Sequence, residues 1–438
     1  MSVAENLIGL LNNAGHAKLM DIQVESIEAF ERHKNVILYS KTGSGKTLAY
    51  LLSLLSKKNN ELVGIQAVIL APTRELCLQI EEVFKSLKSG NKVTICYGGH
   101  SIKTEKNSLL NRPSVIIGTP GRICDHIERG NMRLNSCDFL VIDEFDKCLE
   151  FGFDEEMSFI CKQIKEEHNR MLVSATKIDS IPDYLGSDNY HIIDKSKSDK
   201  QLSIKEYVVE YQGDVFEKLA QLITSLKNER TIVFCNYREV TQDVSERLKK
   251  YNITSTYYHG GLIQKERERA LMKFRNGSAT VLICTDLGSR GLDIPDVQHI
   301  IHYQYPGSRE AFVHRSGRTA RMASNGNSYL LKGPNTEVPG YLDLPDSKLT
   351  IHQKSISAAI PEWTTLYFSA GKKDKVNKID IVGFLMKKGN LEKEEIGLIT
   401  VKDHACYAAI KRGKAKSVLN RIRNEKVKGK RLKIELAK

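Results

Sequence analysis

Short apolar runs alternate with longer helix-like segments through most of this 438-residue sequence, and this alternation constrains the fold most. The runs are rich in Val, Ile and Leu and are bounded by turn or polar residues. Strands buried on both faces have this pattern, so it predicts an α/β fold with a parallel sheet wrapped by helices. The first set of predicted strands is Asn35–Tyr39, Ala67–Leu70, Ser114–Ile117, Phe139–Ile142 and Met171–Val173.

The same alternation begins again after Asp194–Gln201, a polar, charged stretch without periodicity that is a candidate linker. A length of 438 residues exceeds what one hydrophobic core usually serves and favours about three domains. We expect a first domain at residues 1–195, a linker at 196–203 and a second domain at 204–350. The second set of predicted strands is Thr231–Cys235, Thr254–Tyr258, Val281–Cys284, His299–His302 and Ser328–Leu331.

The pattern changes after about Ser347, where a third domain is expected at residues 362–438. Its candidate elements follow the order β-α-β-β-α-β, the split-βαβ plan of an RNA-recognition-type (RRM-like, α+β) domain. The candidate strands are Thr365–Ala370, Ile396–Lys402, Ala405–Ile410 and Arg431–Leu436, and the candidate helices lie near Ile379–Lys388 and Lys414–Asn424.

Positive charge is concentrated in this last domain. Of the formal net charge of +13, the stretch Trp363–Lys438 contributes 20 Lys and Arg against 8 Asp and Glu. A basic module on a nearly neutral body indicates a polyanionic partner. The alternative is a solvated charge run that only aids solubility.

Nine cysteines are scattered without any CxxC pair, which favours reduced thiols over disulfides or zinc ligands. The start of the chain lacks a basic segment followed by an apolar run, and no stretch approaches the length of a membrane span. We therefore expect a cytoplasmic protein with no membrane contact.

A glycine-rich segment, Ser40–Thr47, directly follows a strand-like run and opens into a helix-like one. Its backbone could wrap a phosphate, with Lys46 on the β/γ oxygens and Thr47 on Mg²⁺. The acidic turn Asp143–Asp146 follows another predicted strand, and such carboxylates can support a metal and activate water. Alone, each segment could be a surface turn. Together they predict a site for ATP and Mg²⁺.

The ordered motifs in both halves resemble those of the DEAD-box RNA helicases over nearly the whole chain. The resemblance implies two RecA-like parallel-sheet domains in tandem, forming an ATP hydrolase that separates or remodels RNA locally. The matching segments are Gly15–Gln23, Pro72–Leu76, Gly98-Gly99, Thr119–Arg122, Ser174–Thr176, Thr285–Asp293 and His314–Arg321.

The resemblance also implies roles for single residues. Asp143 would support the metal and Glu144 would activate water, while Asp146 would bond to Ser174 or Thr176. Arg318 and Arg321 would act as arginine fingers from the opposite domain. The other implied nucleotide contacts are Gln23, Thr42, Gly43, Ser44, Gly45, Lys46, Thr47 and Asp293. The implied RNA contacts of the two motor domains are Arg74, Gly99, Thr119, Arg122 and Arg290.

In this family RNA favours closure of the two domains, which completes the ATPase site and bends one strand until a duplex cannot follow. Such contacts go to the backbone and 2′-OH groups, so this grip is expected to ignore base sequence. This sequence departs from the family at Phe145, where alanine is usual. We expect that ring to crowd the phosphate loop, at a cost of about 1–3 kcal/mol, and to alter turnover. Ser40 also replaces a usual glycine.

The last domain resembles the C-terminal RNA-binding domain of the bacterial DbpA-type helicases, for example at Gly371–Lys373 and Lys428–Lys430. That resemblance implies recognition of a hairpin in large-subunit ribosomal RNA, a role in ribosome assembly, and a monomer. Only Tyr407 suits base stacking on the sheet face. Recognition is therefore expected through the basic residues Lys372, Lys373, Lys375, Arg412, Lys414, Lys428 and Lys430.

Two other functions are consistent with the sequence. One is an ATP-gated RNA clamp whose site binds ATP but turns it over little. The other is a DNA helicase, because a pair of RecA-like domains does not by itself specify the sugar. Lone histidines such as His16 and His100 are assigned no role.

Overall fold

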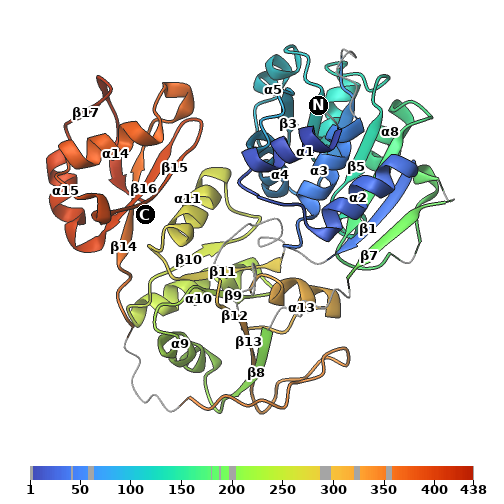
Figure 1. The fold of residues 1–438 in the computed structure, drawn as a ribbon. Helices are drawn as coiled ribbons and strands as arrows, with labels where there is room; N and C mark the ends of the chain where they lie inside the picture. The colour runs from blue at the N-terminus through green and yellow to red at the C-terminus, as the bar shows by residue number, and fades with distance from the viewer. Residues whose placement is uncertain are drawn as a thin grey trace. The chain divides into compact units, whose positions relative to one another are not determined.

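The computed structural model describes residues 3–40, 43–57, 64–178, 180–186, 189–196, 204–286, 297–319, 326–351 and 358–437. The chain divides into two compact units near residue 201, and each is described by itself (Figure 1).

The first unit contains a seven-stranded sheet in the order β3-β4-β2-β5-β6-β1-β7, with every neighbouring pair parallel. This confirms the α/β fold predicted for the first half. The strands are β1 Asn35–Ser40, β2 Ala67–Leu70, β3 Val93–Cys96, β4 Val115–Gly118, β5 Phe139–Ile142, β6 Asn169–Ser174 and β7 His191–Lys195. The helices are α1 Val3–Asn13, α2 Asp21–Arg32, α3 Lys46–Lys57, α4 Arg74–Ser86, α5 Ile102–Leu109, α6 Pro120–Glu128, α7 Phe145–Glu150 and α8 Asp154–Gln163, with a 3₁₀ turn at Asp183–Leu185.

Two hydrophobic clusters cover the two faces of this sheet. The strand β1 contributes to both, because Val36 and Leu38 point to one face while Ile37 and Tyr39 point to the other. Helices α1 to α4 supply the first cluster, and helices α5 to α8 supply the second. Burial on both sides explains why β2, β4 and β5 are apolar at every position.

The edge of the sheet departs from the prediction. The strand β7 runs through Lys195, so Asp194 and Lys195 are not part of a linker. An edge strand has partly exposed positions and tolerates charge, which is why this polar segment did not have a strand-like pattern. The remainder of the predicted linker, residues 197–203, lies outside the described residues.

The second unit contains a six-stranded parallel sheet in the order β10-β11-β9-β12-β13-β8. Its parallel pairing confirms a second domain of the same class as the first. The strands are β8 Ile204–Glu210, β9 Thr231–Phe234, β10 Ser255–Tyr258, β11 Val281–Cys284, β12 His299–His302 and β13 Gly326–Lys332. The helices are α9 Val215–Ser225, α10 Arg238–Lys250, α11 Gln264–Arg275 and α13 Arg309–Ser316.

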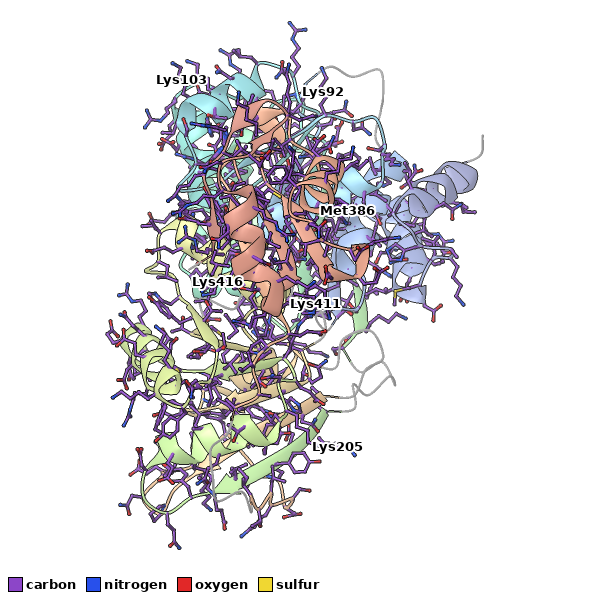
Figure 2. All side chains as sticks on the ribbon, turned by 90° about the vertical axis from the view of Figure 1, so that its left-hand side faces the viewer. Lys92, Lys103, Lys205, Met386, Lys411 and Lys416 are labelled. Carbon is purple, nitrogen blue, oxygen red and sulfur yellow. The ribbon has the colours of Figure 1, made fainter. Side chains whose placement is uncertain are left out.

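The C-terminal domain has a four-stranded antiparallel sheet in the order β15-β16-β14-β19. Both of its α-helices pack on one face of the sheet, which confirms the split-βαβ plan. Long basic side chains project from its surface, Lys416 among them (Figure 2). The elements are β14 Trp363–Phe368, α14 Lys378–Lys387, β15 Ile396–Val401, β16 Cys406–Lys411, α15 Ala415–Ile422 and β19 Ile434–Leu436, with 3₁₀ turns at Lys372–Asp374, Lys393–Glu395 and Arg412–Lys414 and a short hairpin of β17 Lys426–Val427 and β18 Lys430–Arg431.

None of the helices in the described ranges combines the length and the apolar character needed to cross a bilayer. All nine cysteines are buried and unbridged. Burial raises the pKa of these thiols, for example that of Cys137 to about 12.

Candidate functional site

The phosphate-loop segment joins β1 to α3. Gly43 and Gly45 both have positive φ, +83° and +88°, as a loop wrapping a phosphate requires. The Ser40 hydroxyl donates a hydrogen bond to Oγ of Ser44 at 2.7 Å, so the residue that replaces the usual glycine braces the loop. The Lys46 ammonium donates to the Ser40 carbonyl at 2.6 Å. Thr42 lies outside the described residues.

Gln23, on α2, lies against this loop. Its side-chain oxygen accepts a hydrogen bond from the Met20 backbone N–H at 2.9 Å, and the residue is 2% exposed. A Cβ placed on Gly45 would lie 2.9 Å from Nε2 of Gln23, so no larger residue fits there without a shift. The structure therefore brings Gln23 next to the phosphate loop, as the resemblance implied.

The acidic turn begins where β5 ends. In the sheet, β5 is next to β6, and β6 is next to β1. Asp143 is 3% exposed and accepts hydrogen bonds on both carboxylate oxygens, from the Glu144 N–H at 2.9 Å and from the Tyr50 hydroxyl at 3.0 Å. Burial raises the pKa of Asp143, and the charge of Lys46 acts in the opposite direction. Glu144 has left-handed backbone angles (φ 48°, ψ 51°), a strain on the order of 1 kcal/mol for a non-glycine residue.

The segment Ser174–Thr176 contacts the acidic turn directly. The Thr176 hydroxyl donates to Oδ2 of Asp146 at 2.8 Å, which is one of the two contacts that the resemblance implied. Ser174 orders its own segment, because its hydroxyl donates to the Thr176 carbonyl and accepts from the Thr176 N–H. The Thr176–Asp146 bond therefore joins an ordered segment to the acidic turn.

Phe145 does not crowd the phosphate loop, contrary to the expectation from its size. Its ring is fully buried in the cluster that contains Ile37, Tyr39 and Leu172. The side chains of α3, which follows the phosphate loop, belong to the cluster on the other face of the sheet. Phe145 is the first residue of α7, and its ring fills the hydrophobic core on the face away from that loop.

The predicted RNA contacts of the first domain meet near the ends of β2, β3 and β4. Arg74 begins α4, and a Cβ on Gly99 would lie 2.8 Å from Nη1 of Arg74. Gly99 also has a φ of +83°, so both its conformation and its surroundings require glycine. The Thr119 N–H donates to the Cys96 carbonyl at 3.0 Å, next to the Gly98-Gly99 turn.

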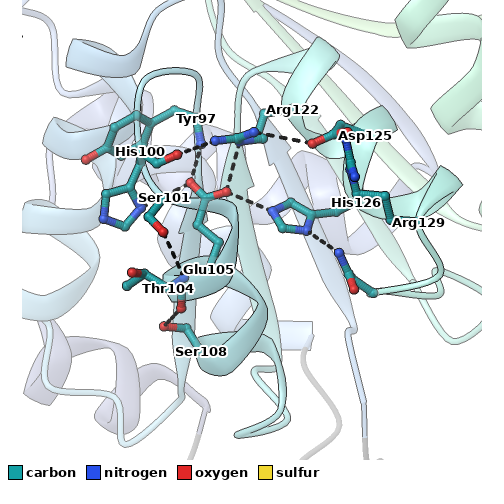
Figure 3. A network of polar contacts seen from close by, with 11 residues as sticks. Tyr97, His100, Ser101, Thr104, Glu105, Ser108, Arg122, Asp125, His126 and Arg129 are labelled. Atoms are coloured by element: carbon teal, nitrogen blue, oxygen red, sulfur yellow. Dashed lines mark hydrogen bonds and ion pairs between the residues drawn. The ribbon is translucent and has the colours of Figure 1, made fainter.

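Glu105 connects these segments, although no motif in the sequence pointed to it (Figure 3). Its carboxylate is 1% exposed and accepts from the Tyr97 N–H at 3.1 Å. It lies 3.2 Å from Nδ1 of His100, 2.8 Å from Nε2 of His126 and 2.9 Å from Nε of Arg122. Burial opposes ionisation, but the hydrogen bonds from His100 and His126, with the Arg122 charge, lower the pKa of Glu105 to about 2.

Arg122 is largely engaged inside the protein. Besides Glu105, its guanidinium contacts the Asp125 carboxylate and the His100 carbonyl, and its side chain is only 12% exposed. Cys96, Glu105 and His126 do offer ligand atoms within 4.8 Å of one another. However, the Arg122 charge already lies against the shared carboxylate and would repel a cation, so this cluster does not fit a metal.

In the second unit the structure describes only one of the predicted arginine fingers. Arg318 follows α13 and is 7% exposed. Arg321, Asp293 and Arg290 lie outside the described residues. Arg315 was not predicted as a site residue, but it is 1% exposed and bonds through Nε and Nη2 to both oxygens of Asp286 at 2.6 Å.

Arg315 also donates to the Gln304 carbonyl at 2.7 Å and to Oδ1 of Asn236 at 2.8 Å. It therefore holds three loops of the second sheet together directly before Arg318. Its place in the motif His314–Arg321 was a usable signal, because a bidentate arginine needs a carboxylate partner such as the one in Thr285-Asp286.

Five predicted lysines lie in two segments of the C-terminal domain that are more than 50 residues apart in sequence, and the fold brings these segments together. Lys428 Nζ donates to the Lys375 carbonyl at 3.0 Å, and Lys430 Nζ donates to the Asp374 carbonyl at 3.2 Å. The hairpin β17–β18 thus lies against the 3₁₀ turn Lys372–Asp374. This lysine cluster, all exposed, comprises Lys372, Lys373, Lys375, Lys428 and Lys430.

Tyr407 and Arg412 both make contacts within the second unit. Tyr407 is 1% exposed and packs with Tyr367 and with Met272 of α11, so it is not open for base stacking. Arg412 donates to the carbonyls of Ser278 and Trp363 at 3.0 and 2.9 Å. Both residues therefore join the C-terminal domain to the rest of the second unit. Lys414 pairs with Glu395 at 3.0 Å.

Three families match consecutive parts of the chain. Residues 20–183 match the DEAD/DEAH box helicase family, residues 214–323 the helicase conserved C-terminal domain, and residues 365–436 the DbpA RNA binding domain.

Curated relatives match over almost their full length. The chain is 30% identical to the ATP-dependent RNA helicase DbpA of Escherichia coli, covering 98% of this chain and 96% of that protein. It is 29% identical to the protein of the same name from Bacillus subtilis, covering 99% and 98%. Among solved structures, S. cerevisiae Dbp5 bound to RNA and ADP BeF3 is similar, with a TM-score of 0.66 and 26% identity over 76% of this chain and 88% of that one.

Proposed function

This chain belongs to the DEAD-box family of ATP-dependent RNA helicases, in the group with a DbpA-type RNA-binding domain, and we propose that it remodels structured ribosomal RNA during large-subunit assembly. It is an ATP-hydrolysing enzyme that binds RNA. In the proposal, the lysine cluster holds a ribosomal RNA hairpin while the two RecA-like domains act on RNA nearby.

The observation that carries the proposal is the convergence at one edge of the first sheet. The phosphate loop follows β1, the acidic turn follows β5, and Ser174–Thr176 follows β6, and these three strands are neighbours. Ligands of open parallel sheets bind at this edge, beyond the carboxyl ends of the strands. The Thr176–Asp146 hydrogen bond supports coupling between the hydrolytic turn and the segment that follows β6.

The residues at this edge fit a magnesium ion. Thr47 and Asp143 offer oxygen donors, which Mg²⁺ prefers, and Asp143 hydrogen-bonds with Tyr50, which lies one turn after Thr47 on α3. A bound Mg²⁺ would offset phosphate charge. In the proposed mechanism Lys46 holds the β/γ phosphates, and Glu144 orients the attacking water and accepts its proton. Arg318 and Arg321 complete the site when RNA favours closure.

Two substitutions test this active site. Lys46→Ala is expected to abolish RNA-stimulated phosphate release, and Glu144→Gln to lower it by about 10²- to 10⁴-fold, the usual contribution of a general base. Glu81→Gln is the matched control, because Glu81 is a carboxylate of the same domain that pairs with Lys85 one turn along α4. Phosphate release that is unchanged in Glu144→Gln would rule out this assignment.

The RNA target needs a separate test. Crosslinking in cells, followed by sequencing of the bound RNA, is expected to recover a large-subunit ribosomal hairpin with the unmodified protein. Replacing Lys428 and Lys430 by alanine is expected to lose that hairpin, while the motor keeps its contacts to RNA of any sequence. Equal recovery of the same RNAs by both proteins would defeat the tethering role.

Three further parts of the proposal follow from the family or the sequence. These are a cytoplasmic location, a monomeric state, and division into domains at 1–195, 204–350 and 362–438 with a linker at 196–203. The RNA-clamp alternative loses its main support, because Phe145 packs away from the phosphate loop. Matched RNA and DNA strands in competition for stimulation of the ATPase distinguish an RNA helicase from a DNA helicase.

A further inference from the structure

A tyrosine hydroxyl is buried between the phosphate loop helix and the acidic turn. Tyr50 is on α3, three residues after Thr47 and therefore on the same side of the helix. Its side chain is fully buried, and its hydroxyl donates a hydrogen bond to Oδ2 of Asp143 at 3.0 Å. The hydroxyl thus contacts one of the two residues that supply oxygen donors for Mg²⁺, and it comes from the helix turn that follows the other, Thr47.

This hydrogen bond fixes the orientation of the Asp143 carboxylate. Oδ1 accepts from the Glu144 N–H at 2.9 Å and Oδ2 accepts from Tyr50, so rotation about the last side-chain bond would break both contacts. Each carboxylate oxygen has two lone pairs, and one on each oxygen remains for a metal or its water. Groups that hydrogen-bond to a metal-supporting residue in this way orient that residue and tune its affinity for the metal.

Packing alone does not account for the hydroxyl. The Tyr50 ring belongs to the apolar cluster formed by α3 with its neighbours, where a phenyl ring of the same shape would fill the same space. A buried hydroxyl is costly unless it is hydrogen-bonded, and here its acceptor is the buried carboxylate of Asp143. A tyrosine therefore differs from a phenylalanine at this position chiefly through its hydrogen bond to Asp143.

We propose that Tyr50 is a positioning residue, which holds the Asp143 carboxylate in the orientation that supports Mg²⁺ on the bound nucleotide. The inference rests on the proposed function, because it takes Asp143 as the metal-supporting group. It adds a residue from outside the recognised motifs. Thr47 and Asp143 are 96 positions apart in sequence, and Tyr50, one turn after Thr47 on α3, bonds to Asp143.

The test removes one oxygen atom. The full-length Tyr50→Phe protein is titrated with fluorescent ADP over a range of Mg²⁺ concentrations, so that no turnover is involved. We expect the Mg²⁺ concentration that gives half of the tightening in ADP affinity to rise by about 10- to 100-fold, the usual effect of removing such a supporting group. ADP affinity without Mg²⁺, and affinity at saturating Mg²⁺, are expected to match those of the unmodified protein.

Two other variants make the outcomes distinguishable. Tyr39→Phe is the matched control, because this tyrosine lies in the same domain and its hydroxyl accepts a hydrogen bond from the Ile178 N–H. It is expected to leave the Mg²⁺ dependence unchanged. Asp143→Asn is expected to shift it strongly.

An unchanged Mg²⁺ dependence in Tyr50→Phe, together with a large shift in Asp143→Asn, would overturn the role of Tyr50 and leave the proposed function intact. An unchanged dependence in Asp143→Asn would instead remove the metal assignment on which both rest. Equal shifts in Tyr50→Phe and Tyr39→Phe would also overturn the inference, because they would indicate a general loss of structure in this domain.

Discussion

The nucleotide edge of the first domain and the lysine cluster of the C-terminal domain hold their charged groups in opposite ways. Asp143 and Glu105 are almost completely buried, and each accepts several hydrogen bonds from defined partners. Lys428 and Lys430 are exposed, and their amines reach backbone carbonyls at the surface. Hydrolysis needs fixed charges in a low dielectric, whereas binding to a phosphate backbone needs charge at a suitable spacing.

This difference predicts how each region responds to substitution. In the buried region each carboxylate has several hydrogen-bond partners, so a substitution should strongly alter the stability of the fold or the geometry of the site. In the lysine cluster the side chains are exposed, and Lys428 also pairs with Asp380 at 3.0 Å, so a change should alter RNA affinity and have only a small effect on stability. Four substitutions test this contrast.

The largest effect is expected from Phe145→Ala, which restores the residue usual in the family. Because the ring is fully buried in a packed cluster, its removal leaves a cavity and should lower the free energy of unfolding by about 3–5 kcal/mol. Urea unfolding of the full chain measures this. Leu398→Ala is the control, since Leu398 in β15 is 47% exposed and its loss should cost about 0.5 kcal/mol or less.

A loss below about 1 kcal/mol in Phe145→Ala would mean that the core around α7 collapses to fill the space. The buried region around Phe145 would then tolerate substitution as well as the surface does.

Glu105→Gln should have the next largest effect, and one that depends on pH. The pKa of Glu105 is lowered from 4.5 to about 2. The ionised carboxylate therefore stabilises the fold fully above about pH 4.5, and this contribution is lost as the pH falls toward 2. We expect the substitution to cost about 1–3 kcal/mol at neutral pH, because charged hydrogen bonds are replaced by neutral ones.

The measurement is the urea midpoint of both proteins from pH 7 to pH 3, in which the difference should shrink below pH 4.5. Glu81→Gln again serves as the control, since its i, i+4 pair with Lys85 should contribute no more than about 0.5 kcal/mol. A constant difference between Glu105→Gln and the unmodified protein at every pH would show that the charge of Glu105 contributes nothing.

The sequence predicted the buried strands best, and the reason is their environment. Ala67–Leu70 and Phe139–Ile142 were predicted to the residue, because every position is buried and a polar residue precedes each strand. The strands β3 and β7 were missed because they are sheet edges with partly exposed positions. The hairpin β17–β18 was missed because each of its strands has only two residues.

Site residues inside recognised motifs could be predicted, but the residues that connect those motifs could not. The Asp146–Thr176 contact was expected because both residues belong to motifs of known order. Tyr50 and Glu105 lie outside the motifs, and their partners are fixed only by the fold. Tyr50 is 93 residues from Asp143, and Glu105 is 21 residues from His126. Local spacing carries no information about such pairs.

A smaller effect, limited to RNA binding, is expected from replacing Lys428 and Lys430 by alanine. Each phosphate contact that is lost should reduce the dependence of log affinity on log salt concentration by about 0.7–0.9. Stability should change by about 0.5 kcal/mol or less, because both amines are exposed. RNA affinity measured at several salt concentrations tests this, with Lys416→Ala as a basic surface control in the same domain. Equal salt dependence in all three proteins would remove the lysine cluster from the RNA-binding surface.

The smallest effect is expected from Ser40→Ala, at the position where serine replaces the usual glycine. The Ser40 hydroxyl donates to Ser44 at 2.7 Å across the phosphate loop, and one neutral hydrogen bond contributes about 0.5–1.5 kcal/mol. Its loss should weaken ADP binding by about two- to tenfold through a less ordered loop. Ser56→Ala is a suitable control, because its hydroxyl bonds only to a carbonyl near the end of α3. If Ser40→Ala bound ADP as tightly as the unmodified protein, the loop would be ordered by its glycines and Lys46 alone. The close hydrogen bonding around Asp143 would then not extend to the phosphate loop.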